Sequence, residues 1–198
     1  MAQGGQRFAA LLFICGKVES GRKINLVIIQ EPVAGLSEAM LTTFARRACR
    51  AVRLKGAISV LVTSSRELRS LNRRFRSKNK ATDVLSFPAM PGLVPDYAGD
   101  IAISAEIAAK NARRLGHSAV DEIKVLTVHG ILHLAGYDHE RDHGAMERKE
   151  KRLRKALGLP SGLIERTSSS ENRSKVKKPG ARISAKTGTG RRSSRAPR

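Results

Sequence analysis

Apolar residues in this chain fall into short continuous runs and into longer stretches with helical spacing. Runs rich in Val and Ile, bounded by turn residues, are typical of β-strands. Four such runs occur, at Ile24–Gln30, Ala57–Thr63, Asp83–Ala89 and Asp100–Ser104. A Pro- and Gly-rich segment, Met90–Gly99, separates the last two and is predicted to be a loop.

Between these strands, apolar residues recur every three or four positions, which is the spacing of helices packed on a core. Ser37, Ser64 or Ser65, and Ser118 are suitable N-caps. Five helices are therefore predicted, over 38–55, 65–76, 105–115, 119–135 and 142–157, with Gly56 and Gly136 as the stops of the first and fourth. The pattern predicts an α+β fold, with a small mixed sheet of about four strands packed against about five helices.

The net charge of the chain predicts the kind of partner that it binds. There are 38 Lys and Arg residues against 17 Asp and Glu, which gives a net charge of +21 and predicts a polyanionic partner, either nucleic acid or an acidic membrane. Residues 166–198 hold eleven Lys or Arg and one acid, so they contribute +10 and leave +11 for residues 1–165. Such a composition predicts disorder. This tail is either a solubilising end or a basic arm that adds salt-sensitive affinity for RNA.

The chain is expected to have three parts. They are an N-terminal extension (1–22), one folded domain (23–163) and the disordered basic tail (164–198). The apolar run Phe8–Cys15 is too short for a membrane span and is followed by no signal-peptide cleavage site. Cys15 and Cys49 form no CxxC pair, so we expect a cytoplasmic protein without disulfides.

The stretch HGILHLAGYDH carries the clearest chemistry. His129 and His133 are four residues apart and project from one face of the predicted helix. Gly136 can adopt a left-handed backbone, which returns the chain so that His139 becomes a third ligand. This is the metal-helix spacing of the zinc proteases. Three imidazoles leave a coordination position open, so we expect a catalytic zinc site, with nickel or another first-row metal as the alternative.

One part of the protease motif is missing. Zinc proteases carry a glutamate general base directly after the first histidine, where this chain has Gly130, so peptide hydrolysis is disfavoured. A three-histidine zinc site lowers the pKa of coordinated water to about 7 without that carboxylate, and an anionic ester would suit the basic body. Asp138 is the nearest proton acceptor in sequence and could instead orient a ligand histidine. We expect His143 to be solvated or substrate-facing and His117 to lie on the surface.

Three motifs in order, HGILHLAGYDH, LNRRFRSKNKATDVLSFP (Leu71–Pro88) and GDIAIS (Gly99–Ser104), resemble the YbeY family of bacterial endoribonucleases. The resemblance implies a single α+β domain, one Zn²⁺ on the three histidines and cleavage of single-stranded RNA. It also implies roles in 3′-end maturation of 16S rRNA and in ribosome quality control. The implied partners are single-stranded rRNA, the small ribosomal subunit with one of its proteins, and an Era-type GTPase, with no membrane.

The resemblance implies a role for Arg76, and the chemistry and position of four neighbouring residues indicate roles for them. Arg76 matches the functionally important arginine of the family, and a planar, permanently charged side chain suits a phosphorane-like transition state. Lys78 and Lys80 are expected to bind backbone phosphates. Asp83 and Asp100 could each orient a ligand histidine or cap the local backbone, and the local structural role is slightly favoured.

Aromatic residues make up only 4% of the chain and Trp is absent, so RNA binding should depend on phosphate contacts rather than stacked bases.

Two other functions remain open from the sequence. One is a ribosome-assembly factor whose structural metal is closed by a fourth ligand such as Asp138. The other is a metal-dependent hydrolase of peptides or small molecules, which would have an apolar cleft.

Overall fold

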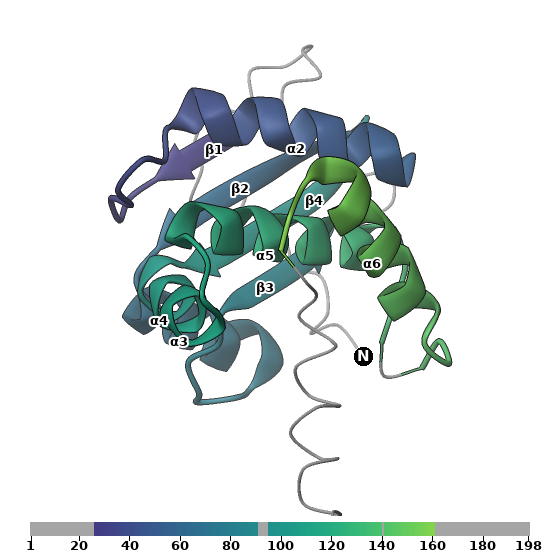
Figure 1. Cartoon of the computed structure of the whole chain (residues 1–198). Coiled ribbons are helices and arrows are strands. Elements are labelled where there is room, and N and C mark those ends of the chain that lie inside the picture. Colours follow the sequence, from purple (N-terminus) through teal and green to yellow (C-terminus); the bar gives the residue numbers. More distant parts are fainter. Residues whose placement is uncertain (1–25, 91–94, 140, 161–198) are drawn as a thin grey trace, which may run out of the picture.

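Figure 1 shows the protein as a computed structural model, in which residues 26–90, 95–139 and 141–160 are described. Within these ranges the chain forms four strands and five helices. The predicted α+β fold is therefore confirmed. The predicted N-terminal extension (1–22) and basic tail (164–198) lie outside the described residues, as do Ile24 and Asn25 of the first predicted strand.

The four strands form one mixed sheet in the order β1-β2-β4-β3. Strands β1 (Leu26–Ile29), β2 (Ala57–Thr63) and β4 (Tyr97–Ser104) run parallel, and β3 (Val84–Pro88) pairs antiparallel with β4. Strand β3 is therefore an edge strand, and one of its two sides has no strand neighbour in the sheet.

Serine side chains begin four of the five described helices. Ser37, Ser64, Ser104 and Ser118 each accept a hydrogen bond from the backbone N–H three residues later, which confirms the predicted caps and adds Ser104. The helices are α2 (Glu38–Val52), α3 (Ser65–Arg76), α4 (Ala105–Leu115), α5 (Ala119–Leu134) and α6 (Ala145–Leu157).

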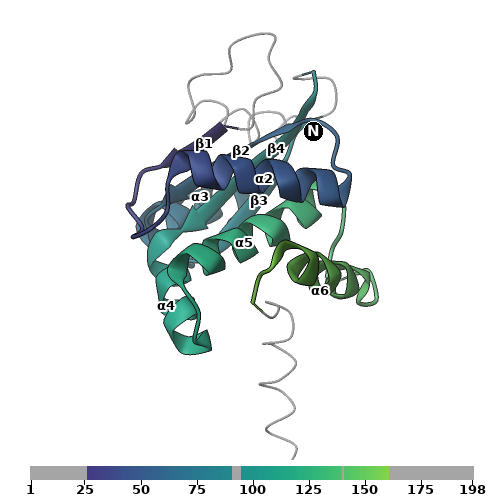
Figure 2. The same cartoon turned by 45° about the horizontal axis from the view of Figure 1, so that its top comes forward.

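Helix α5 lies at the centre of the larger core. It contacts α2, α4 and α6 as well as strands β3 and β4, and its residues 125–132 are all buried. Figure 2 shows α5 on one face of the sheet with these three helices around it. Helix α3 packs on the other face, where Leu68 and Leu71 meet Leu85 and Phe87 of β3. The two helices therefore approach β3 from opposite sides.

Two helix ends differ from the prediction. Helix α2 ends at Val52 and not at Gly56, because Arg53 itself takes a left-handed conformation (φ 63°) and its N–H bonds the carbonyl oxygens of the last turn. Helix α6 begins at Ala145 and not at Asp142. The preceding Gly144 is left-handed (φ 79°), and the Asp142 carboxylate caps the helix from outside by accepting the Met146 N–H at 2.8 Å.

Strand β4 begins at Tyr97, three residues before the predicted start at Asp100. The glycine at 99 lies within the strand with φ 141°, and a Cβ there would overlap the carbonyl oxygen of Phe87 on the neighbouring strand. The prediction that Gly99 ends a loop is therefore wrong, because Gly99 is a strand residue that permits close approach of β3 and β4.

None of the described helices is long and apolar enough to cross a membrane. Cys49 is a buried free thiol, and its burial raises its pKa to about 11. It is therefore a packed core residue with little thiolate at neutral pH.

Candidate metal centre

Helix α5 and the turn after it bring three histidines together. The Gly136 N–H bonds the His133 carbonyl oxygen and the Tyr137 N–H bonds that of Leu132, both at 3.0 Å, while Gly136 has φ 87°. This is a Schellman turn, which reverses the chain at a left-handed glycine. It returns His139 to the side of α5 that carries His133, as the sequence predicted.

The three imidazoles form the metal-ligand group found in the described part of the chain. One ring nitrogen from each of His129, His133 and His139 lies within 4.8 Å of the other two, and the Nε2 atoms of His129 and His133 are 3.1 Å apart. His129 is buried, His133 is half-buried and His139 is exposed. These donors fit a divalent first-row ion bound on one side by the protein and open to solvent on the other.

His133 is suited to be a neutral ligand. Burial of the ring is the main cause that lowers its pKa to about 4, and the adjacent His129 and His139 lower it further, against the opposing effect of Asp138. The His133 ring is therefore uncharged at neutral pH, which is the form in which an imidazole binds a metal.

The residue that orients a ligand histidine is Glu150, which the sequence reasoning missed. Its carboxylate oxygen Oε2 lies 3.0 Å from Nδ1 of His129, and the Glu150 side chain is 2% exposed. Its other oxygen accepts a bond from Nη1 of Arg154 at 3.2 Å, and that side chain is also 2% exposed. A carboxylate on Nδ1 keeps the proton there and directs the Nε2 lone pair of His129 toward the metal position.

Gly130 faces the sheet and not the open side of the site. A Cβ at this position would lie 2.8 and 2.9 Å from two methyl carbons of Ile101 on β4. Ile101 is fully buried, so it has little room to move. The absence of a glutamate after the first histidine is therefore explained by close packing of α5 on the sheet.

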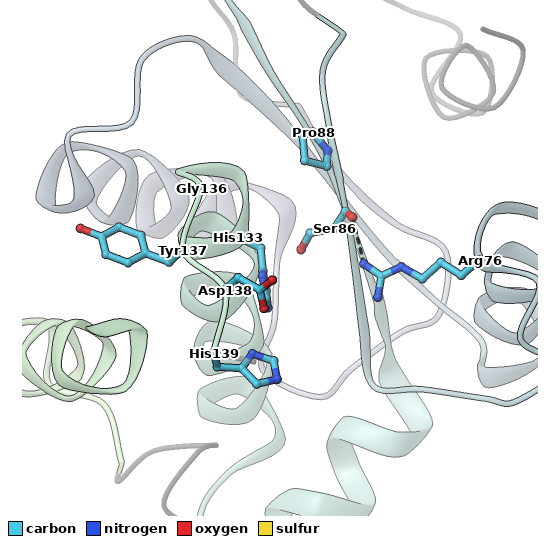
Figure 3. Close-up of a pocket in the computed structure, with 8 residues that line it drawn as sticks. All are labelled: Arg76, Ser86, Pro88, His133, Gly136, Tyr137, Asp138 and His139. Carbon is cyan, nitrogen blue, oxygen red and sulfur yellow. Dashed lines mark hydrogen bonds between the residues drawn. The ribbon is translucent and has the colours of Figure 1, made fainter. Parts of the chain in front are cut away.

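A pocket of about 370 Å³ opens beside the histidines. Figure 3 shows Arg76 reaching toward it from the end of α3, on the far side of β3 from His133 and His139. The Nη2 of Arg76 donates to the Ser86 carbonyl oxygen at 3.5 Å, on the open side of the edge strand. The lining residues are Arg76, Ser86, Pro88, His133, Gly136, Tyr137, Asp138 and His139.

The other predicted site residues lie in different places. Asp138 lines the pocket, and its side chain is 40% exposed with a long 3.7 Å ion pair to Arg141. Lys78 and Lys80 are exposed in the loop after α3 and do not line the pocket. The Asn72 amide holds this loop by donating to the Lys80 carbonyl oxygen at 2.7 Å.

Among the described residues, Asp83 and Asp100 bond local donors and not a ligand histidine, so they take local structural roles. Asp83 accepts the Val84 N–H at 3.0 Å and the amide of Asn111 at 3.4 Å. Asp100 accepts the Tyr97 hydroxyl at 2.5 Å, and burial raises its pKa to about 6 against the lowering effect of its hydrogen bonds.

The two remaining histidines differ from each other. His143 is exposed with a left-handed backbone (φ 52°), in agreement with a solvated position. The expectation that His117 lies on the surface is wrong, because its side chain is only 10% exposed and its Nε2 lies 2.6 Å from the buried carboxylate of Glu122. His117 links the start of α5 to the end of α4.

An open group of three imidazoles opposite a permanent cation, in a polar pocket, is a metal site suited to an anionic substrate. The profile of the family Endoribonuclease YbeY matches residues 25–158. The chain belongs to the YbeY family of endoribonucleases.

Individual relatives agree with the family. Endoribonuclease YbeY of Koribacter versatilis is 57% identical over 142 residues, which cover 72% of this chain and 91% of the relative. The Solibacter usitatus protein of the same name is 48% identical over 144 residues, which cover 72% of this chain and 95% of the relative. A solution structure from Thermotoga maritima is 28% identical, with a TM-score of 0.46, and covers 79% of this chain and all of its own.

Proposed function

We propose that this endoribonuclease is zinc-dependent, cleaves single-stranded RNA, and acts in 3′-end maturation of 16S rRNA and in ribosome quality control. The observation that supports zinc dependence is the open three-histidine group, with ring nitrogens within 4.8 Å of one another, facing a pocket that Arg76 also lines. Among the described residues the group of ligands comprises three histidines and does not include Asp138, which favours an open catalytic site over a closed structural one.

His129, His133 and His139 would hold a divalent ion, which would supply Lewis acidity toward a phosphoryl oxygen. The Arg76 guanidinium carries the positive charge and the N–H donors that stabilise the additional negative charge of the transition state. Asp138 offers a solvated carboxylate on the pocket wall, which can accept a proton from the attacking water or ribose hydroxyl. Glu150 acts through His129, because its bond to Nδ1 leaves Nε2 of that ring available to bind the metal.

The pocket itself provides little means to read a sequence. At about 370 Å³ it has room for roughly one nucleotide, and Tyr137 is the one aromatic residue among the lining side chains apart from the histidines. Under this proposal the choice of cleavage site comes from partners that present the strand. These are the small ribosomal subunit, one of its proteins and an Era-type GTPase.

Metal removal and replacement tests the proposal. The full-length protein is stripped with a chelator, reloaded with Zn²⁺, Ni²⁺ or Mg²⁺, and incubated with end-labelled RNA in single-stranded and duplex form. We expect cleavage of the single strand only, restored by Zn²⁺ and absent in His133→Ala. Products with 5′-phosphates indicate attack by water, whereas 2′,3′-cyclic phosphates indicate attack by the ribose hydroxyl. Cleavage that persists in the stripped protein and in His133→Ala would contradict zinc dependence.

A further inference from the structure

A row of arginines follows the exposed side of α3. Arg66, Arg69, Arg73 and Arg76 recur at intervals of three and four residues, so they lie on one side of the helix, and all four are exposed. The opposite side of α3 carries the buried residues that pack on β3 and β4. We call these four residues the arginine row.

The charges of the arginine row are not neutralised within the fold. No carboxylate in the described part of the chain forms an ion pair with any of the four guanidinium groups. Arg69 donates through Nε to the amide oxygen of Asn79 at 2.9 Å, a neutral partner that orients its side chain and leaves its charge in place. A surface with uncompensated and partly ordered guanidinium groups favours an anionic ligand.

The arginine row ends at the catalytic pocket. Arg76 is the last residue of α3 and also lines the pocket, across β3 from His133 and His139, as Figure 3 shows. At a rise of about 1.5 Å per residue, the row extends about 15 Å from Arg76 back to Arg66, with one arginine for each helical turn of about 5.4 Å. A flexible single strand can present successive phosphates at such an interval.

We infer that the arginine row is the track along which the sugar–phosphate backbone of single-stranded RNA leaves the pocket. The inference rests on the proposed function and assigns the substrate its path. Arg76 contacts the phosphate that reacts, and the other three arginines bind about three consecutive phosphates on one side of it. These contacts go to the backbone, so they add affinity without sequence preference.

The test compares two full-length variants with the same loss of charge. The row variant replaces Arg66, Arg69 and Arg73 by glutamine and keeps Arg76. The control variant replaces three exposed arginines of α2 by glutamine, namely Arg46, Arg47 and Arg50. Helix α2 packs on the other face of the sheet from α3 (Figure 1). Binding of a fluorescent 12-nucleotide RNA is measured by anisotropy over a range of salt concentrations, and thermal unfolding verifies that both variants are folded.

We expect the row variant to bind RNA at least tenfold more weakly than the control variant. The slope of log affinity against log salt should be shallower by about 2 in the row variant, because each single-strand phosphate contact contributes about 0.7. Cleavage of a 12-nucleotide substrate should fall in the row variant through KM. Cleavage of a dinucleotide, which contacts Arg76 but cannot reach Arg66, Arg69 and Arg73, should not change.

Equal affinities and equal slopes in the two variants overturn the inference, because general charge alone would then explain binding. The binding assay requires no cleavage, so this failure is distinct from failure of the proposed function. The two proposals can also fail separately. If the row variant binds RNA more weakly than the control variant, but the zinc-loaded wild type cleaves no RNA, the proposed activity is refuted and the arginine row remains an RNA-binding surface.

Discussion

Replacing Glu150 by glutamine tests whether this residue prepares His129 for the metal. Glutamine retains the shape of the side chain but loses the charge that holds the proton on Nδ1 of His129, 3.0 Å away. It also weakens the bond to Arg154, which shares the buried position. Removing a carboxylate that orients a ligand histidine commonly lowers metal affinity about 10- to 100-fold, or about 1.4 to 2.8 kcal/mol.

The assay is competition for Zn²⁺ with a chromophoric chelator at pH 7.5, carried out on protein first stripped of metal. Glu147→Gln is the matched control, because Glu147 lies one turn earlier on α6, and in the described part of the chain it is Glu150 and not Glu147 that bonds a ligand histidine. We expect Glu150→Gln to lose 10- to 100-fold in zinc affinity and Glu147→Gln to bind as the wild type does.

The effect of Glu150→Gln on folding stability must be separated from its effect on the orientation of His129. Breaking a buried ion pair can cost about 3–5 kcal/mol when one partner is removed, and the isosteric glutamine is chosen to keep the loss smaller. Thermal unfolding of the metal-free proteins measures this loss of stability directly. A folded Glu150→Gln variant with wild-type zinc affinity would refute the role assigned to Glu150.

Four further substitutions test the packing of α5, two helix-ending turns and one buried carboxylate. Gly130→Ala should destabilise the protein by about 1–3 kcal/mol in urea unfolding, because the added methyl meets the buried Ile101; unchanged or higher stability would show that the helix can move off the sheet. Gly136→Ala and Gly116→Ala both place a Cβ at a left-handed position with open space around it, and each should cost about 1–2 kcal/mol of folding stability. Only Gly136→Ala should also weaken zinc binding, which competition with a chelator would measure. The pKa of Asp100 is raised to about 6 from an ordinary value of 3.8, so its ionisation opposes folding increasingly as pH rises from about 4 to about 6. Asp100→Asn should therefore be more stable than the wild type at pH 7.5, by at most about 3 kcal/mol, and the difference should vanish below pH 4; a constant difference across pH would contradict the shift.

The sequence predicted the parts of the site that depend on local spacing. His129 and His133 share a face because of helical periodicity, and Gly136 permits the turn that returns His139. Serine caps and Val- and Ile-rich runs placed the strands and helices within a few residues.

The sequence did not reveal contacts that arise from tertiary packing. Glu150 is 21 residues from His129 and occurs in a highly charged helix, where nothing local distinguishes it from its exposed neighbours. Asp83 and Asp100 begin predicted strands near the site, which makes them candidates, but their carboxylates accept hydrogen bonds from local donors. The reason for Gly130 also required the structure, because Ile101 of β4 comes from a distant segment of the chain.

We propose that Arg76 and the three-histidine group act together on RNA. The most direct test is the rate at which zinc-loaded Arg76→Ala cleaves single-stranded RNA, with metal content measured for each protein. Arg74→Ala is the control, since Arg74 is exposed, lies 5.5 Å from the Phe75 ring centroid and does not line the pocket. We predict that Arg76→Ala keeps one zinc per chain and loses about 100- to 1,000-fold in kcat, while Arg74→Ala stays within a few-fold of the wild type. Equal cleavage by the wild type and Arg76→Ala, both with full zinc content, would contradict the account.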